Sequence, residues 1–184
     1  SVLALQHHKV LIIGMDLRKP QLFRELSVDN GKGVSTLLTG QSTLDESLHR
    51  TGISGLDLLP SGPVPPNPSE LLAKKEVVAM LQELKRRYDF IIIDTAPVGI
   101  VSDAFALMPH ADINLFVVRD NYTRKDHFRS VNELAAGGKA TNLCILINDA
   151  GAGAAHGYGY TGYGYYEDES SIKGPGLLRF FLKR

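Results

Sequence analysis

Residues 88–97 have the sequence Tyr88-Asp89-Phe90-Ile91-Ile92-Ile93-Asp94-Thr95-Ala96-Pro97, and this stretch decides the fold. Four consecutive apolar residues lead into a carboxylate. A run this short and apolar is typical of a strand buried on both faces, inside a parallel sheet covered by helices. Asp94 then lies at the carboxyl end of the strand, where a carboxylate can hold Mg²⁺ beside a nucleotide phosphate. The stretch predicts a Walker B segment, with a turn-capping aspartate as the alternative.

A second aliphatic run ends in the same way. It is Lys9-Val10-Leu11-Ile12-Ile13-Gly14-Met15-Asp16-Leu17-Arg18-Lys19-Pro20. Neighbouring parallel strands lie about 4.8 Å apart, so Asp16 and Asp94 can converge on one cation if the two strands are adjacent. The sequence contains no Gly-x-x-x-x-Gly-Lys-Ser/Thr loop, the usual cradle for phosphates. We therefore expect a magnesium site built from two carboxylates, with the phosphate cradle missing.

Composition limits the classes of protein that fit. The chain has 184 residues, 43% hydrophobic and 22% charged, which suffices for one α/β domain with a core. The formal net charge is zero, so we expect no nucleic-acid partner. No apolar stretch approaches the roughly 20 residues of a membrane span, and we expect a soluble chain. Cys144, the single cysteine, lies in an apolar run and is expected to be buried rather than reactive.

Strands and helices alternate along the chain. The spacing predicts buried strands at residues 10–13, 56–59, 90–93, 113–118 and 143–147, of which the second is the weakest. Alternation of this kind indicates a mainly parallel α/β sheet. The first residues, Ser1 to Gln6, have no initiating methionine and resemble the last turns of a helix that feeds the first strand. We expect the chain to be a fragment.

The clearest helix follows Pro68. Asn67 is expected to cap it, Pro68 suits its first position and Glu70 its third. Its apolar side is predicted to comprise Leu71, Leu72, Val78, Leu81 and Leu84. Further helices are predicted at residues 102–107 and from Thr123 to the glycine pair at 137–138.

An ordered set of motifs carries a resemblance to a known family. The set comprises Leu17-Arg18-Lys19-Pro20, Gly33 to Gly40, Gly62 with Pro65-Pro66-Asn67-Pro68-Ser69-Glu70-Leu71-Leu72, Tyr88 to Pro97 and Val117-Val118-Arg119. Over roughly residues 1–150 the chain resembles the bacterial tyrosine kinases that regulate capsule and exopolysaccharide assembly. These are P-loop proteins related to the septum-positioning and partition ATPases. The resemblance implies a three-layer P-loop NTPase-like domain, with the first strand and the P-loop missing from this chain.

The resemblance also implies roles for single residues, with ATP and Mg²⁺ as cofactors. Asp94 matches the Walker B aspartate. Asp16 matches the second aspartate, and Arg18 the arginine, of an Asp-x-Asp-x-Arg motif called Walker A′, so these three are the candidate catalytic residues and the two aspartates the candidate metal ligands. The first aspartate of that motif is Gly14 here. Without it and without the loop lysine, phosphoryl transfer by this fragment alone is expected to fail.

Two residues at strand ends lie where relatives contact the nucleotide base. These are Arg119, after the run at residues 113–118, and Asn148, after the run at residues 143–147. The alternative is a surface arginine and a turn-forming asparagine.

Residues 151–184 are expected to form a flexible tail, after a partial kinase-like domain at residues 1–150. Five tyrosines alternate with glycines and precede Glu167-Asp168-Glu169. The candidate phosphoacceptors are Tyr158, Tyr160, Tyr163, Tyr165 and Tyr166. The alternative is a Gly/Tyr linker without phosphate chemistry. Residues 177–184 mix apolar and basic groups, for which a partner contact or disorder is favoured over a membrane surface.

The resemblance implies partners as well. They are further copies of the chain that phosphorylate each other in trans, a membrane-embedded polysaccharide co-polymerase or activator and a cognate tyrosine phosphatase, at the cytoplasmic face of the bacterial inner membrane. Two other functions remain open. One is a non-catalytic interaction domain of the export apparatus that only receives phosphate, which Gly14 favours. The other is a partition-type ATPase, against which the tyrosine cluster argues.

Overall fold

The structure is a computed structural model that describes residues 2–97, 103–123, 142–150 and 178–183. Its helices and strands, in chain order, are α1 Val2–Leu5, β1 Val10–Gly14, α2 Leu22–Glu25, α3 Val34–Leu38, α4 Leu44–Ser47, β2 His49–Arg50, β3 Leu56–Leu59, α5 Pro68–Leu72, α6 Lys75–Arg87, β4 Phe90–Thr95, η1 Asp103–Ala106, η2 Met108–His110, β5 Ile113–Arg119, β6 Leu143–Asn148 and β7 Leu178–Lys183. The two η elements are 3₁₀ turns.

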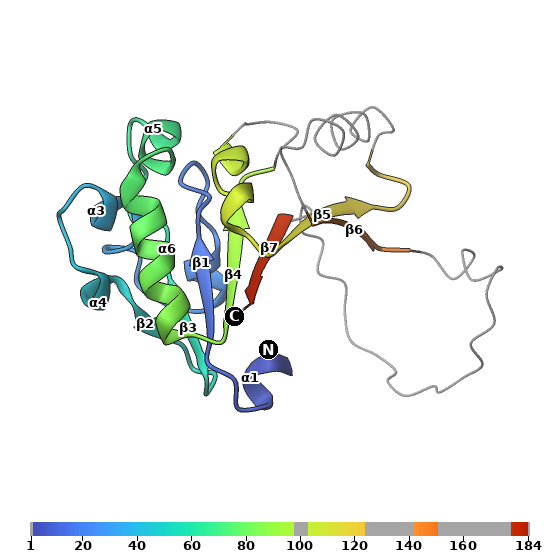
Figure 1. Cartoon of the computed structure of the whole chain (residues 1–184), viewed down its shortest axis with the longest axis horizontal. Coiled ribbons are helices and arrows are strands. Elements are labelled where there is room, and N and C mark those ends of the chain that lie inside the picture. The colour runs from blue at the N-terminus through green and yellow to red at the C-terminus, as the bar shows by residue number, and fades with distance from the viewer. Residues whose placement is uncertain (1, 98–102, 124–141, 151–177, 184) are drawn as a thin grey trace.

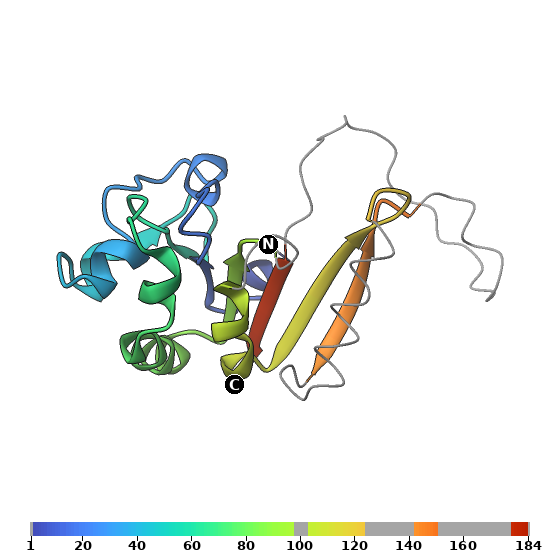
Figure 2. The ribbon, with the colours of Figure 1, turned by 90° about the horizontal axis from the view of Figure 1, so that it is seen from above.

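The strands form one mainly parallel sheet in the order β2-β3-β1-β4-β7-β5-β6 (Figure 1). Strands β3, β1 and β4 pair in parallel, as do β5 and β6. The short β2 and the last strand β7 run antiparallel to their neighbours. Figure 2 shows β5 and β6 side by side, away from α3 and α4. The predicted α/β class and its parallel sheet are confirmed.

All five predicted strands are present, some of them longer than predicted. The weakest prediction, residues 56–59, matches β3 at both ends. β4 continues through Asp94 to Thr95, because these two residues pair with β7. Asp94 therefore lies within the strand, one residue before its end.

Alternate residues of β1 and β4 face two separate clusters, which makes the described domain three-layered. Leu11, Ile13, Ile91 and Ile93 join the main core, to which α6 also contributes. The alternate residues Val10 and Ile12 of β1 and Phe90 and Ile92 of β4 pack on the other face, with Ala4 of α1. Each fully buried aliphatic side chain contributes about 1.5–3 kcal/mol. The sheet is thus covered on both faces, as a parallel sheet requires.

The helix predicted after Pro68 is two helices. Asn67 occupies the N-cap position of the first, as predicted, but its side chain makes no capping hydrogen bond. Helix α5 ends at Leu72 and α6 begins at Lys75. Lys74 donates from Nζ to the carbonyl oxygen of Leu38, 3.1 Å away. The Asn67 side chain instead donates to Glu70 Oε2, at 2.7 Å.

The break between α5 and α6 changes which residues of α6 are buried. Val77, Met80, Leu81 and Leu84 face the core, whereas Val78 is only half-buried. Within α6, the prediction of buried residues was correct for Leu81 and Leu84, but it named Val78 where the buried residue is Val77. A single continuous helix was assumed, and the interruption resets the phase of its residues relative to the core.

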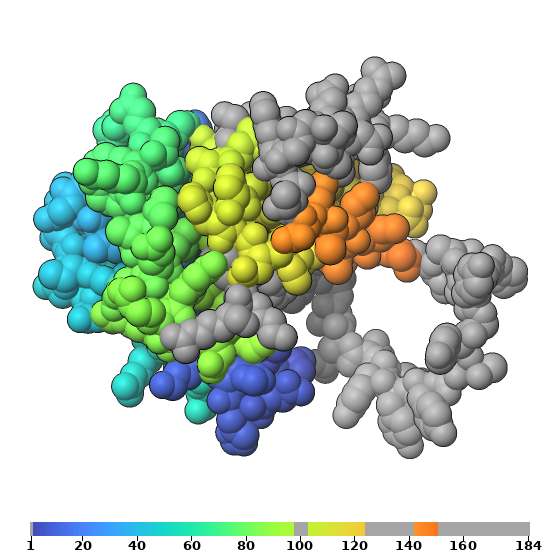
Figure 3. Space-filling model, viewed as in Figure 1, coloured from blue at the N-terminus to red at the C-terminus, as the bar shows by residue number. Residues whose placement is uncertain are grey.

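Cys144 is exposed, so the prediction of a buried thiol is wrong. The run from Leu143 to Ile147 does form a strand, but that strand is β6, at the edge of the sheet. Ile145 and Ile147 are also exposed, and Figure 3 shows the residues of β6 (orange) at the surface. An edge strand has a neighbour on only one side, so an aliphatic run there is less covered than in the middle of the sheet.

The chain after residue 150 is only partly described. Leu178–Lys183, within the predicted flexible tail, form β7 between β4 and β5. The remainder of the tail and the helix predicted after Thr123 lie outside the described residues. The helix predicted at residues 102–107 appears as the 3₁₀ turn η1. Within the described ranges no helix is long and apolar enough to cross a membrane.

Candidate functional site at the carboxyl edge of the sheet

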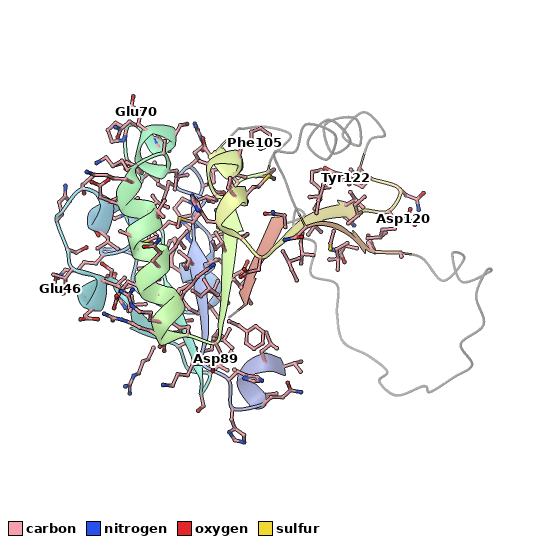
Figure 4. The ribbon with its side chains drawn as sticks, viewed as in Figure 1. Glu46, Glu70, Asp89, Phe105, Asp120 and Tyr122 are labelled. Carbon is pink, nitrogen blue, oxygen red and sulfur yellow. The ribbon has the colours of Figure 1, made fainter. Side chains whose placement is uncertain are left out.

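The two predicted metal ligands lie at the same edge of the sheet. Gly14, the last residue of β1, pairs with Asp94 of β4, and the Met15 amide donates to the Asp94 carbonyl oxygen at 2.7 Å. Asp16 follows immediately. The adjacency of the two strands, on which the prediction of a shared cation depended, is therefore present. In Figure 4, Glu70 and Phe105 lie at this edge and Asp89 at the opposite end of β4.

Asp94 is a buried acidic residue, with a relative exposure of 8%. It follows Ile93, which is fully buried in the core below it. A carboxylate withdrawn from water costs free energy unless a cation or hydrogen-bond donors compensate it. Asp94 also lies at the carboxyl edge of the sheet, where open α/β sheets bind their ligands, and a carboxylate there can contribute to a cation site.

Asp16 is held by the turn that follows it. Its Oδ1 accepts hydrogen bonds from the backbone amides of Arg18 and Lys19, both at 3.0 Å. Oδ2 accepts none from the described residues. One oxygen therefore fixes the side chain to its own loop, and the other remains available to a ligand.

The donor set fits Mg²⁺ bound together with phosphates. Mg²⁺ commonly takes one or two protein carboxylates and completes its octahedral shell with water and substrate phosphate oxygens. Asp16 and Asp94 supply two hard oxygen ligands of this kind. Among the described residues there is no group of three or more His, Cys, Asp or Glu side chains placed to hold a metal. Two carboxylates leave most of an octahedral shell to water and phosphate oxygens, so this pair is suited to a cation bound together with a nucleotide.

The Arg18 side chain is engaged with two other segments. Its Nε and Nη2 donate to the two carboxylate oxygens of Asp103, at 2.7 and 3.2 Å, and Nη2 also donates to Ser69 Oγ at 2.8 Å. The Asp103 side chain is 4% exposed and that of Arg18 41%. The hydrogen bond from Arg18 lowers the pKa of Asp103, and the same bond raises the pKa of Arg18. Nη1 donates to none of the described residues.

Arg119 and Asn148 lie together, two and three strand positions away from β4 respectively. They pair in register at the ends of β5 and β6. Arg119 bonds Asp149 Oδ2 through Nε and Nη2, each at 2.8 Å, and its guanidinium lies 5.4 Å from the ring centre of Tyr122. Asn148 Oδ1 accepts from the Asp149 amide at 2.9 Å. The structure brings this pair to the predicted edge, and its contact with a nucleotide base stays a prediction.

The five candidate phosphoacceptor tyrosines lie outside the described residues. Two other tyrosines are described. Tyr88 is half-buried and donates to Asp57 Oδ2 at 2.8 Å. Burial, and then this hydrogen bond, raise the pKa of Tyr88 well above its ordinary value. Tyr122 is exposed.

Two site residues were missed by reasoning from sequence: Asp103 and Ser69. Asp103 was included in a short predicted helix, and Ser69 in the Pro-Pro-Asn-Pro segment that contributed most to the resemblance. Neither was assigned a partner, because Arg18 lies 85 residues before Asp103 and 51 before Ser69. No local spacing rule connects positions so far apart.

A mainly parallel α/β sheet with two aspartates at its carboxyl edge is the arrangement of nucleotide-binding α/β proteins, to which the P-loop class belongs. Comparison with solved structures agrees. The kinase domain of the Escherichia coli tyrosine kinase ETK superposes with a TM-score of 0.76 at 34% identity, covering 89% of this chain and 64% of that one. The septum site-determining protein MinD from Pyrococcus horikoshii, complexed with Mg-ADP, shares the fold with a TM-score of 0.60 at 24% identity.

Curated relatives give the family. The tyrosine-protein kinase YwqD of Bacillus subtilis is 34% identical over 161 residues, which span 88% of this chain and 68% of YwqD. The tyrosine-protein kinase Wzc of Salmonella typhimurium is 34% identical over 170 residues, which span 92% of this chain but 23% of Wzc. No protein-family model matches the chain. The chain belongs to the bacterial tyrosine-protein kinase family, and it corresponds to the kinase domain.

Proposed function

We propose that this domain binds MgATP at the carboxyl edge of its sheet and transfers the terminal phosphoryl group to tyrosine hydroxyls. The observation that supports the proposal most strongly is the pairing of Gly14 with Asp94, because it brings Asp16 and Asp94 to neighbouring strand ends. The relatives that share about a third of the sequence are tyrosine-protein kinases.

The chain's own residues have defined tasks in this reaction. Asp94, buried at its strand end, binds the cation directly or through water, and Asp16 offers the oxygen that its loop does not use. The cation supplies positive charge that neutralises the phosphates. Phosphoryl transfer depends mainly on such charge compensation and on alignment of the reacting groups. Arg119 and Asn148 are proposed to border the base.

The acceptors are proposed to be the five tail tyrosines, phosphorylated by a neighbouring copy of the protein. Each phosphate adds about −1.5 to −2 charges beside an acidic run, so successive modification builds repulsion that loosens contacts between copies. The polymer system served is proposed to be capsular or exopolysaccharide export at the cytoplasmic face of the inner membrane. A membrane-embedded activator and a tyrosine phosphatase are the proposed partners.

A second function, a non-catalytic domain that only receives phosphate, is favoured by one observation. Gly14 stands where the family motif has an aspartate, and a Cβ at this position lies 2.6 Å from Ser61 Oγ. An acidic side chain at position 14 therefore needs Ser61 to move. A kinase lacking this carboxylate retains two of the three acidic groups of its motifs.

A fusion experiment separates the two functions. The segment of YwqD that precedes the matched region is joined ahead of residue 1, and phosphotyrosine is measured with ATP and Mg²⁺. The kinase proposal predicts activity that Asp94→Asn abolishes, because a neutral amide leaves the phosphate charge uncompensated.

Asp89→Asn is the matched control for this experiment. Asp89 lies at the other end of β4, and its Oδ2 accepts from the Lys9 amide at 2.9 Å, a bond that an amide oxygen can keep. Its activity should equal that of the unaltered fusion. An inactive fusion favours the non-catalytic function, whereas activity that survives Asp94→Asn contradicts the assignment of Asp94 to the cation.

A further inference from the structure

Three segments that are distant in sequence meet at the carboxylate of Asp103. Its Oδ2 accepts from Arg18 Nε at 2.7 Å, and its Oδ1 accepts from Ser69 Oγ at 2.7 Å and from Arg18 Nη2 at 3.2 Å. Ser69 Oγ in turn accepts from Arg18 Nη2 at 2.8 Å. The loop after β1, the first turn of α5 and the turn η1 are thereby closed into one ring of hydrogen bonds.

The geometry of this ring holds the Arg18 side chain in one conformation. A guanidinium that meets a carboxylate through two N–H groups fixes both distance and orientation. Asp103 is buried and charged, so releasing Arg18 leaves a carboxylate without its counter-ion in a poorly hydrated place. The alternative conformations of the Arg18 side chain are therefore unfavourable.

The ring acts on Asp16 through two backbone amides. The amides of Arg18 and Lys19 both donate to Asp16 Oδ1 at 3.0 Å. Fixing the Arg18 side chain restricts its backbone, and with it the direction of these two N–H bonds. The orientation of Asp16 at the cation edge is thus coupled to Asp103, 87 positions along the chain.

We infer that Asp103 and Ser69 are positioning residues, which hold the loop after β1 through Arg18 so that Asp16 keeps its orientation toward the metal site. The inference rests on the proposed function only for the identity of the ligand. It gives a function to Ser69 of the Pro-Pro-Asn-Pro-Ser-Glu segment and to Asp103, whose carboxylate contacts Arg18 and Ser69.

Hydrogen exchange of the whole chain, without metal or nucleotide, tests the coupling. Asp103→Asn should speed exchange in peptides covering residues 15–20 about tenfold, and leave peptides from α6 unchanged. Ser69→Ala should give a smaller change in the same peptides, and Ser69→Thr, which keeps a hydroxyl, should restore protection. Ser69 is exposed, so its variants keep the test decisive if Asp103→Asn fails to fold.

Asp112→Asn is the matched control, since it also removes one carboxylate charge. Asp112 lies 3.8 Å from Lys85 at the surface, outside the three segments of the ring and nine positions after Asp103. It should leave residues 15–20 unchanged. Two results would overturn the positioning role. One is faster exchange in Ser69→Ala or Asp103→Asn that is spread equally over α6 and β4, because it shows a general loss of stability. The other is unchanged exchange at residues 15–20.

Metal affinity provides the second readout. Titration with Mn²⁺ and ADP should show affinity weakened about 10- to 100-fold in Asp103→Asn, in the range seen when groups that orient metal ligands are removed. If Asp103→Asn speeds exchange at residues 15–20 but leaves the Mn²⁺ affinity unchanged, the inference is overturned. Asp94→Asn in the same titration tests the metal site itself. If the Mn²⁺ affinity of Asp94→Asn equals that of the unaltered chain, the proposed metal site is wrong. The hydrogen-exchange data then still decide whether Asp103 is coupled to the loop after β1.

Discussion

Gly14→Ala should destabilise the domain, although alanine usually stabilises a position that was glycine. A Cβ at residue 14 lies 2.6 Å from Ser61 Oγ and 3.1 Å from the Ser61 backbone nitrogen. Overpacking of this kind costs about 1–3 kcal/mol. The loss of unfolded-state entropy returns about 0.4–1 kcal/mol. The expected net decrease in the free energy of unfolding is about 1–2 kcal/mol, measured by urea unfolding.

A double-mutant cycle locates the cause. Ser61→Ala removes the Oγ atom, after which the nearest neighbour of the new methyl group is the backbone nitrogen at 3.1 Å. In the Ser61→Ala background, Gly14→Ala should cost close to nothing, which corresponds to a coupling energy of about 1–2 kcal/mol. Gly52→Ala is the control, because a Cβ there meets nothing within 4 Å. A cost at position 14 that is the same with and without the Ser61 hydroxyl would refute the reasoning.

The same contact governs the functional variant Gly14→Asp. The family motif has an aspartate at this position, so the change should raise kinase activity in the fusion protein. The structure adds a condition: the larger gain is expected in the Gly14→Asp, Ser61→Ala double variant, where the new side chain has room.

Three further outcomes are expected. The chain alone should bind MgATP with a dissociation constant weaker than about 10 μM in calorimetry, about −7 kcal/mol, because its sequence has no phosphate loop; tighter binding would reveal another cradle. An active relative with ATP and Mg²⁺ should phosphorylate residues 158–166 and spare Tyr88, whose hydroxyl donates to Asp57; mass spectrometry that finds phosphate only elsewhere would make the tail a linker. The pKa of Asp103 is lowered in the fold, so the stability lost in Asp103→Asn should be full above about pH 4, the ordinary range of the group, and shrink as pH falls through the lowered pKa; a pH-independent difference in unfolding free energy would contradict this.

The strands were predictable from sequence because each contains a short aliphatic run, the pattern typical of a strand in an α/β sheet. Their position in the sheet was not predictable in the same way. The run at Cys144 has the composition of a central strand but lies at the edge, since strand order depends on pairing between segments far apart. Nor did periodicity predict that residues 178–183 join the sheet.

The site was predictable for those residues whose own local sequence is characteristic. Asp16 and Asp94 each follow an aliphatic run, and their strands are adjacent as expected. The interruption between α5 and α6 was missed because it involves a contact of Lys74 with Leu38, which local helix propensity does not contain. The ring at Asp103 was missed for the same reason. Contacts of this kind follow from the fold and not from the local pattern.

Paramagnetic broadening by Mn²⁺ tests the central claim, a nucleotide-bound cation at Asp16 and Asp94, most directly. Mn²⁺ with ADP is added in small amounts to the isotopically labelled chain, and NMR spectra are recorded; weak binding suffices for this measurement. The amide signals of Asp16 and Asp94 should broaden first, while those of Asp57 and Asp89, at or near the opposite ends of β3 and β4, persist. Equal broadening at both edges, or broadening confined to the Asp57 and Asp89 edge, would contradict the account.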